Sequence, residues 1–95
     1  MAIFINMLRT RSLEKIVRGF SNHRRIEILA LLSEKPDLSV FEVSEELNVN
    51  FKTISDHLRR LLNAGLLVKK NKGNMVCNKL SGLGVSTLKF LRTLE

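Results

Sequence analysis

One stretch decides the fold of this chain: NVNFKTISDHLRRLLNAG, at residues 48–65. Asn50 is a strong N-cap residue whose side chain can accept the backbone N–H of Thr53, and Gly65 can adopt the left-handed conformation that ends a helix. Together they predict a helix from Phe51 to Ala64. Its apolar residues recur at spacings of three and four and form one stripe, Phe51, Ile54, Leu58, Leu61 and Leu62.

The opposite side of this helix is polar and basic. It carries Lys52, Asp56, Arg59, Arg60 and Asn63, with Thr53 and Ser55 beside them. A helix that is buried along one edge and lined with cations, amides and hydroxyls along the other suits the major groove of DNA. We therefore predict a DNA-recognition helix, in which Arg59 and Arg60 hold phosphates and Asp56 accepts from cytosine N4.

Charge is divided unevenly along the 95 residues, whose formal net charge is +7. Residues 1–25 hold six Arg and Lys against one acid, whereas residues 26–50 hold six acids against one Lys. Residues 51–79 hold seven Arg and Lys against one acid, so the basic excess covers the predicted recognition helix and the segment after it. This distribution is typical of a surface that binds a polyanion.

The length and composition favour a single domain over residues 1–95, with no repeat and one proline. The one cysteine, Cys77, cannot form an intrachain disulfide, and no CxxC pair is present, so a reducing, cytoplasmic location is expected. The apolar segment at residues 1–8 is too short to span a bilayer and lacks a preceding basic region. We expect no membrane partner.

The rest of the chain predicts further helices and a hairpin. Helical apolar spacing favours helices at residues 12–20, 23–33 and 40–47, and a final helix at about 83–94. Five consecutive apolar residues, 28–32, mark the second of these as the central core helix. Ser39 and Glu42 stand at capping-box spacing before the third.

The third helix and the recognition helix are separated by a tight turn, so residues 39–64 predict a helix-turn-helix. Two β-biased arms around a loop that contains glycine then predict a hairpin at about residues 66–80. A hairpin in this place is a wing, and it would present Lys69, Lys70 and Lys72 to phosphates or the minor groove. The predicted fold class is mainly α with a small β-hairpin: a winged helix-turn-helix of about five helices plus a two-stranded wing.

These residues resemble the ArsR/SmtB family of winged-helix repressors. The family signature runs Thr-(Val/Ile)-Ser-x-His-Leu and then Leu-x-x-Ala-Gly-Leu, and this chain has TISDHL at residues 53–58 and LLNAGL at residues 61–66. The stretch FSNHRRIEIL at residues 20–29 is similar to the segment that opens the family's second helix, with His23 where proline is usual. The resemblance covers about residues 12–94.

The resemblance implies base and backbone contacts from Lys52, Thr53, Ser55, Asp56 and His57, and wing contacts from Lys70 and Lys72. The full predicted DNA-binding set is Asn50, Lys52, Thr53, Ser55, Asp56, His57, Arg59, Arg60, Lys69, Lys70 and Lys72. Phe51 departs from the polar residue usual in the family, and its place on the apolar stripe predicts inward packing. His57 has two open interpretations, a phosphate contact or a hydrogen bond between the helix and the wing.

Family members are homodimers joined through their first and last helices. The matching apolar residues here are Leu13, Ile16, Val17, Leu88, Leu91 and Leu94. A twofold dimer would set its recognition helices about 34 Å apart on a palindromic operator.

Metal-sensing relatives carry Cys-x-Cys in the third helix, where this chain has Ser39 and Phe41. The family's other metal site needs His and carboxylates, but residues 78–95 contain no His and only Glu95. We therefore predict no metal site and no cofactor. Cys77 stays open between a redox switch and a small packing residue.

The sequence offers no catalytic constellation, so we predict no enzyme activity. The leading hypothesis is a sequence-specific regulator of transcription that binds double-stranded DNA, a dimeric repressor. The alternative is a winged-helix module for protein interaction or assembly that does not read DNA. RNA or single-stranded DNA ranks third, because the chain has no Tyr or Trp for base stacking.

Overall fold

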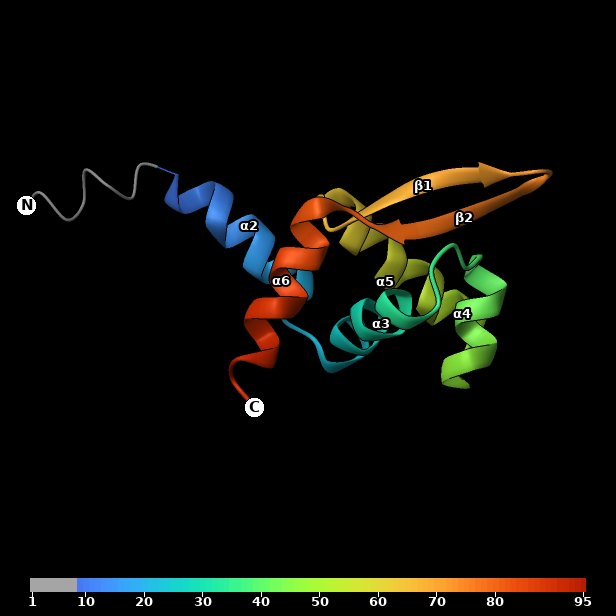
Figure 1. Ribbon diagram of the computed structural model, residues 1–95, viewed down its shortest axis with the longest axis horizontal. Coiled ribbons are helices and arrows are strands. Elements are labelled where there is room, and N and C mark those ends of the chain that lie inside the picture. The colour runs from blue at the N-terminus through green and yellow to red at the C-terminus, as the bar shows by residue number, and fades with distance from the viewer. Residues whose placement is uncertain (1–8) are drawn as a thin grey trace, which may run out of the picture.

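The computed structural model describes residues 9–95, and the apolar segment at residues 1–8 lies outside the described part. The elements in chain order are α2 (Thr10–Phe20), α3 (His23–Glu34), α4 (Val40–Leu47), α5 (Phe51–Asn63), β1 (Leu67–Lys72), β2 (Met75–Leu80) and α6 (Gly82–Arg92). The described residues therefore form five helices and one two-stranded antiparallel hairpin, as the sequence predicted. The tip of the hairpin lies at the opposite end of the molecule from α2 (Figure 1).

Side-chain caps set the starts of the two helices of the helix-turn-helix. Ser39 and Glu42 form the predicted capping box at α4. The Asn50 side chain accepts from the backbone N–H of Lys52 at 2.8 Å and of Thr53 at 3.3 Å, so α5 begins where predicted. Helix α2, by contrast, begins two residues earlier than predicted and has no side-chain cap.

The two chain reversals around α5 use left-handed backbone conformations. Asn48 has φ 53° in the turn between α4 and α5, and the Ser44 hydroxyl donates to the Val49 carbonyl at 2.6 Å. At the other end Gly65 has φ 79° and donates to the Leu62 carbonyl at 3.0 Å, as in a Schellman motif. These reversals fix α5 across α4 and direct the chain into the wing.

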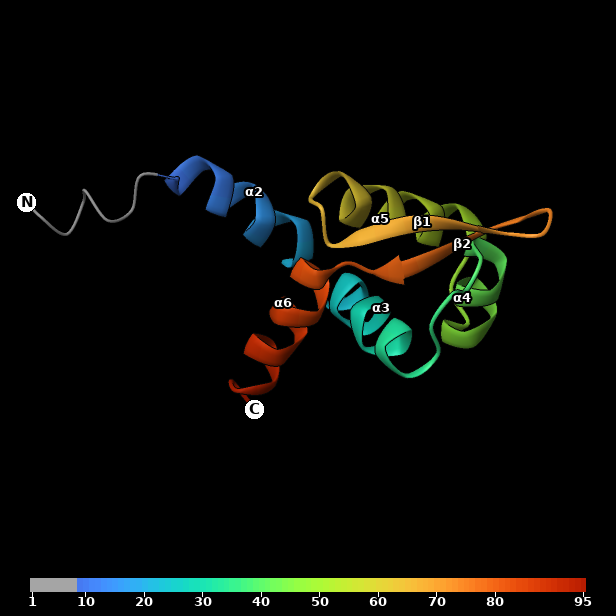
Figure 2. The same cartoon turned by 45° about the horizontal axis from the view of Figure 1, so that its top comes forward.

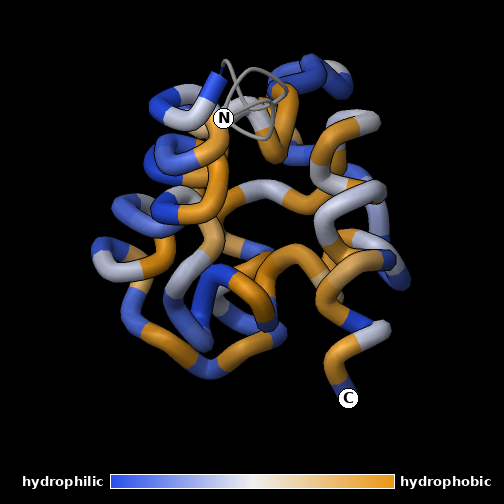
Figure 3. Tube along the Cα trace, turned by 90° about the vertical axis from the view of Figure 1, so that its left-hand side faces the viewer, coloured by the Kyte–Doolittle hydropathy of each residue, from blue (hydrophilic) through white to orange (hydrophobic). Residues whose placement is uncertain are grey.

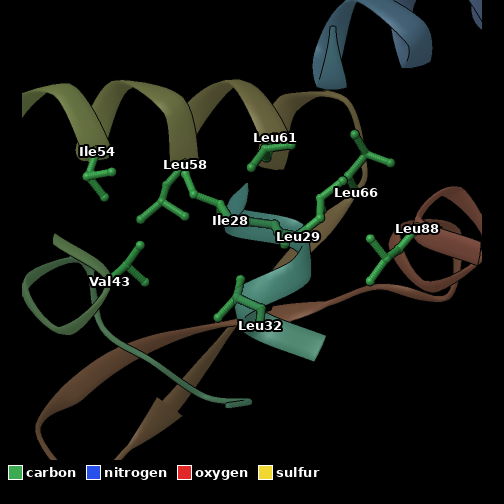
Figure 4. Packing of buried hydrophobic residues seen from close by; sticks show 10 residues of the cluster. Ile28, Leu29, Leu32, Val43, Ile54, Leu58, Leu61, Leu66 and Leu88 are labelled. Carbon is green, nitrogen blue, oxygen red and sulfur yellow. The ribbon is translucent and has the colours of Figure 1, made fainter. Parts of the chain in front are cut away.

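The core gathers around α3, in which Ile28 and Leu29 are fully buried. Three residues of α5, Ile54, Leu58 and Leu61, point into this core, with Ile54 above Val43 of α4 and the other two by Ile28 and Leu29 (Figure 4). Burying each of these side chains contributes about 1.5–3 kcal/mol to folding. The apolar stripe of α5 is thus held against its own chain, and the opposite face of the helix is left at the surface.

Two glycines permit close approaches that any other residue would block. A Cβ at Gly19 would lie 2.3 Å from the Cβ of Ala64, which brings α2 directly onto the end of α5. A Cβ at Gly84 would lie 2.1 Å from the carbonyl oxygen of Leu66, so α6 packs on the backbone that leads into the wing. Gly84 therefore permits close packing, although glycine lowers the intrinsic stability of the helix.

The wing is fastened to the body at its base. Asn78 of β2 pairs with Leu38, donating from its backbone N–H at 2.8 Å and from Nδ2 at 3.3 Å to the same carbonyl. Cys77, the neighbouring residue, is 1% exposed, which agrees with the packing interpretation of this thiol. Figure 2 shows the hairpin running alongside α5, so both elements can face one ligand.

The apolar surface of α2 and α6 differs from the predicted one. Leu88 is 5% exposed and belongs to the core, because it faces α3 instead of solvent. Ile16 also packs against the core, and Leu91 is half-buried. The exposed apolar residues on these helices are Leu13, Val17, Leu83, Val85 and Phe90, and Leu94 is exposed in the turn after α6. Figure 3 looks onto this end of the molecule and shows apolar stretches in the helix that leads to the C-terminus.

Within residues 9–95, none of the helices has both the length and the apolar character that a membrane crossing requires.

Candidate nucleic-acid interface

The outward face of α5 is built as predicted, with one side buried and the other open. Lys52, Thr53, Ser55, Arg59 and Arg60 are exposed, and they alternate with the buried core residues of the same helix. Asn50 is also exposed, but its side-chain carbonyl is engaged in capping, so only its amide N–H groups are left to donate outward. The helix therefore presents donors and cations along most of its length.

Asp56 holds two arginines on this face. Its Oδ2 accepts from Arg60 Nε at 3.1 Å, and its Oδ1 accepts from Arg59 Nη2. These hydrogen bonds hold the pKa of Asp56 below its ordinary value, and the bond from Arg60 has the larger effect. The carboxylate is thus already engaged, and a contact with cytosine would require the arginines to release it.

His57 is half-buried, and its ring forms a hydrogen bond with α3 instead of with the wing. Its Nδ1 lies 3.2 Å from Nη1 of Arg25 on α3. A guanidinium can only donate, so Nδ1 accepts and the neutral ring carries its proton on Nε2. Burial, followed by the charge of Arg25, lowers the pKa of His57. The histidine therefore ties the recognition helix to α3. Of its two open interpretations, the hydrogen bond to the wing is not formed, and the phosphate contact stays a prediction.

The predicted inward packing of Phe51 is wrong. The side chain is 52% exposed and lines a surface hollow together with Lys52, Ser55 and Arg59. It does not pack inward because it occupies the first turn of α5, beyond the core cluster, whose contribution from this helix begins at Ile54. An aromatic ring consequently lies among the polar groups of the outward face.

The three wing lysines have different surroundings. Lys69 and Arg59 line opposite sides of a groove between β1 and α5. Lys70 is paired with Asp37 at 3.4 Å, which offsets part of its charge. Lys72 is exposed near the tip. Hydrogen bonds from Ser39 lower the pKa of the Glu42 carboxyl most, and the charge of Lys72 lowers it further, so Lys72 lies near Glu42. Lys69 and Lys72 are therefore the wing cations best placed for a polyanion.

Helix α2 adds two cations that the sequence analysis did not assign to the interface. Lys15 and Arg18 line a hollow with Arg59 and Arg60 where α2 crosses the end of α5. The only sequence signal for them was the basic excess in residues 1–25. Positive charge thus extends from the wing tip, across α5, to α2.

The positions that match the family's metal ligands have other roles here. Ser39 is held in the capping box of α4, and Phe41 is a 59% exposed hydrocarbon side chain with no donor atom. Between residues 9 and 95, no cluster of three or more His, Cys, Asp or Glu side chains is arranged to hold a metal ion.

Solved structures of regulators share this fold. HlyU from Vibrio cholerae N16961 has a TM-score of 0.78 and 27% identity, with 92% of this chain and 95% of that chain covered. An ArsR-like transcriptional regulator from Rhodococcus sp. RHA1 has a TM-score of 0.74 and 26% identity, with coverage of 90% and 77%. The homodimeric winged helix-turn-helix DNA-binding domain Mb0332 from Mycobacterium bovis has a TM-score of 0.77 and 24% identity, with coverage of 90% and 78%.

No curated protein sequence matches the chain significantly. A family model does: the one described as bacterial regulatory protein, arsR family, matches residues 22–69, which run from the cap of α3 through the recognition helix into β1. The chain therefore belongs to the arsR family of bacterial regulatory proteins and is a winged-helix, DNA-binding regulator of transcription.

Proposed function

We propose that this chain is a homodimeric repressor that binds a palindromic DNA operator in the cytoplasm through α5 and the wing. The observation that carries the proposal is the outward face of α5, where Arg59 lies beside Lys69 of the adjacent strand and Arg60 lies beside Lys15 and Arg18 of α2. Arg59, Arg60, Lys69 and Lys72 would neutralise phosphates. A bound dimer would repress by occupying the operator.

The bases would be read by the first turns of α5. Lys52 can donate to guanine O6 and N7, and the hydroxyls of Thr53 and Ser55 can bond either donors or acceptors on base edges. Phe51 offers an exposed ring, which suits contact with the 5-methyl group of thymine. Asp56 would act first by orienting the two arginines, since both of its oxygens already accept from them.

The dimer would form through α2 and α6. Both helices lie at the end of the molecule opposite the wing tip (Figures 1 and 2). Val17 is 50% exposed, Phe90 55% and Leu94 66%, and apolar surface of this kind marks protein contacts. The Mb0332 domain, which shares the fold, is itself homodimeric. We place Leu13, Val17, Leu83, Phe90 and Leu94 in the interface, with Leu91 behind them.

In this role the protein would use no metal and no cofactor and would catalyse no reaction. Ser39 and Phe41 supply no thiolate at the family's sensing position, so release from DNA would depend on another kind of signal. A winged-helix module that docks only on protein is the competing function. It differs in a measurable way, because protein docking needs no salt-dependent affinity for DNA.

The test compares two charge reversals of equal size by fluorescence anisotropy with labelled random-sequence duplexes. Lys69→Glu/Lys72→Glu alters the wing, and Lys89→Glu/Arg92→Glu alters α6, away from the outward face of α5. We expect the wing variant to lose at least about tenfold in affinity and the α6 variant to bind like the wild type. Equal losses would show that only net charge matters, and a wild type that does not bind would favour the protein-docking module.

A further inference from the structure

A groove lies on the far side of the core from α5, away from the candidate nucleic-acid interface. It runs between the end of α3, the end of β2 and one side of α6, and it encloses about 390 Å³. Its floor is apolar and includes Leu32, Leu80 and Leu88. This volume falls in the range of sites that hold small organic molecules, which is about 300–1,000 Å³.

Three cations, Lys79, Lys89 and Arg92, line the same groove. Among residues 9–95, no carboxylate forms an ion pair with any of the three, and neither Glu34 nor Glu95, the acids nearest in sequence to the end of α3 and to α6, lines the groove. The C-terminal ends of α3 and α6 each contribute about half a negative charge. Three full positive charges outweigh these dipoles, so the groove favours an anion.

The groove lies on a different side of α6 from the proposed dimer surface. Leu83 and Phe90 fall on one stripe of this helix at helical spacing, and Leu94 follows in the turn after it, whereas Leu88 and Arg92 face the groove. The groove can therefore stay open in a dimer that buries the stripe. It also joins the wing, through the end of β2, to the helix that would carry the dimer contact.

We propose that this groove binds a small carboxylate with an apolar tail, and that this ligand is an effector of DNA binding. The carboxylate would lie among Lys79, Lys89 and Arg92, where the planar guanidinium can donate two parallel hydrogen bonds. The tail would cover Leu32 and Leu88. The effector role rests on the proposed function, whereas the ligand site itself does not.

Binding to the ligand site is measured without DNA, by isothermal titration calorimetry with octanoate in a chloride buffer. Octanamide, which keeps the tail without the charge, and octylammonium, which reverses the charge, are the matched probes. We expect saturable binding of one octanoate per chain, with octanamide at least tenfold weaker and octylammonium not bound. Equal affinity for all three would overturn an anion site.

Two variants locate the site. Lys89→Glu/Arg92→Glu should weaken octanoate binding at least tenfold, and Lys69→Glu/Lys72→Glu, which makes the same change of charge on the wing, should leave it unchanged. Both pairs are surface residues, and circular dichroism verifies folding. Val85→Asp, which puts a carboxylate on the groove's exposed rim, is a second variant that should abolish binding. Wild-type affinity in Lys89→Glu/Arg92→Glu or in Val85→Asp would overturn the location.

The effector role is tested by repeating the duplex titration with saturating octanoate. We expect the affinity of the wild type for DNA to change at least threefold and that of Lys89→Glu/Arg92→Glu to stay constant. Octanoate binding without any change in DNA affinity would overturn the effector role and leave the ligand site. A chain that binds octanoate but no DNA would instead overturn the proposed function.

Discussion

Replacing Arg59 and Arg60 by alanine should remove two phosphate contacts from each recognition helix. Each contact contributes about 0.9 to the slope of log affinity against log salt, so the slope should become shallower by about 1.8 per chain and about 3.6 per dimer. Between about 50 and about 200 mM salt, the wild-type dimer should therefore lose about 150-fold more affinity than the variant does. Both side chains are exposed, so the variant should fold normally.

The assay is anisotropy with labelled duplex across that salt range. Lys89→Ala/Arg92→Ala is the matched control, because it removes the same charge from α6. Asp56 loses both partners in the double variant, its pKa rises toward the ordinary value, and its unpaired charge then repels phosphate. Adding Asp56→Asn removes that repulsion and isolates the lost contacts. A variant whose slope equals the wild-type slope would show that the outward face of α5 does not meet DNA.

Four further results are expected. Gly84→Ala should lower the free energy of unfolding by about 1–3 kcal/mol because no space exists for a methyl group, whereas Gly82→Ala, with nothing within 4 Å, should not; urea denaturation measures both. Burial and a neighbouring guanidinium lower the pKa of His57 below 6.5, so the unfolded chain takes up this proton first. The free energy of unfolding should therefore fall as the pH drops through and below 6.5, and it should fall less in His57→Gln. Urea denaturation at about pH 7.5 and about pH 5 measures this fall, and an equal fall in the wild type and in His57→Gln would refute the prediction. Phe90→Glu should yield monomers in analytical ultracentrifugation. A variant with the same fraction of dimer as the wild type would exclude Phe90 from the interface. Uracil in place of thymine at a contacted position should weaken DNA binding by the wild type about fourfold and leave binding by Phe51→Ala unchanged, as measured by anisotropy. An equal loss of affinity in both proteins would refute the contact between Phe51 and the methyl group.

Local signals in the sequence predicted the helix-turn-helix well. Asn50, Ser39 and Gly65 each act within a few residues of themselves, through caps and a left-handed turn, so their effect can be read without knowing the fold. The switch from helical spacing to β-biased arms located the wing in the same way. These elements place the recognition helix, and most of the candidate interface follows from them.

The errors concern contacts that depend on distant parts of the chain. Phe51 and Ile54 share one apolar stripe, but the core formed by other helices covers only the second. Leu88 and Leu94 both belong to the apolar stripe predicted near the C-terminus, yet only Leu88 packs against α3. The partner of His57 is 32 positions away, on Arg25, and no spacing rule reaches that far.

The most direct measurement of the central claim is selection of bound duplexes from a random pool by the wild-type protein. If paired α5 helices read adjacent turns of the major groove, the selected sequences should share a palindrome whose half-sites lie about 10–10.5 base pairs apart, centre to centre. The Arg59→Ala/Arg60→Ala protein should recover the same consensus only at lower salt. Failure of the wild type to enrich any sequence, or enrichment of a single half-site without symmetry, would contradict the account.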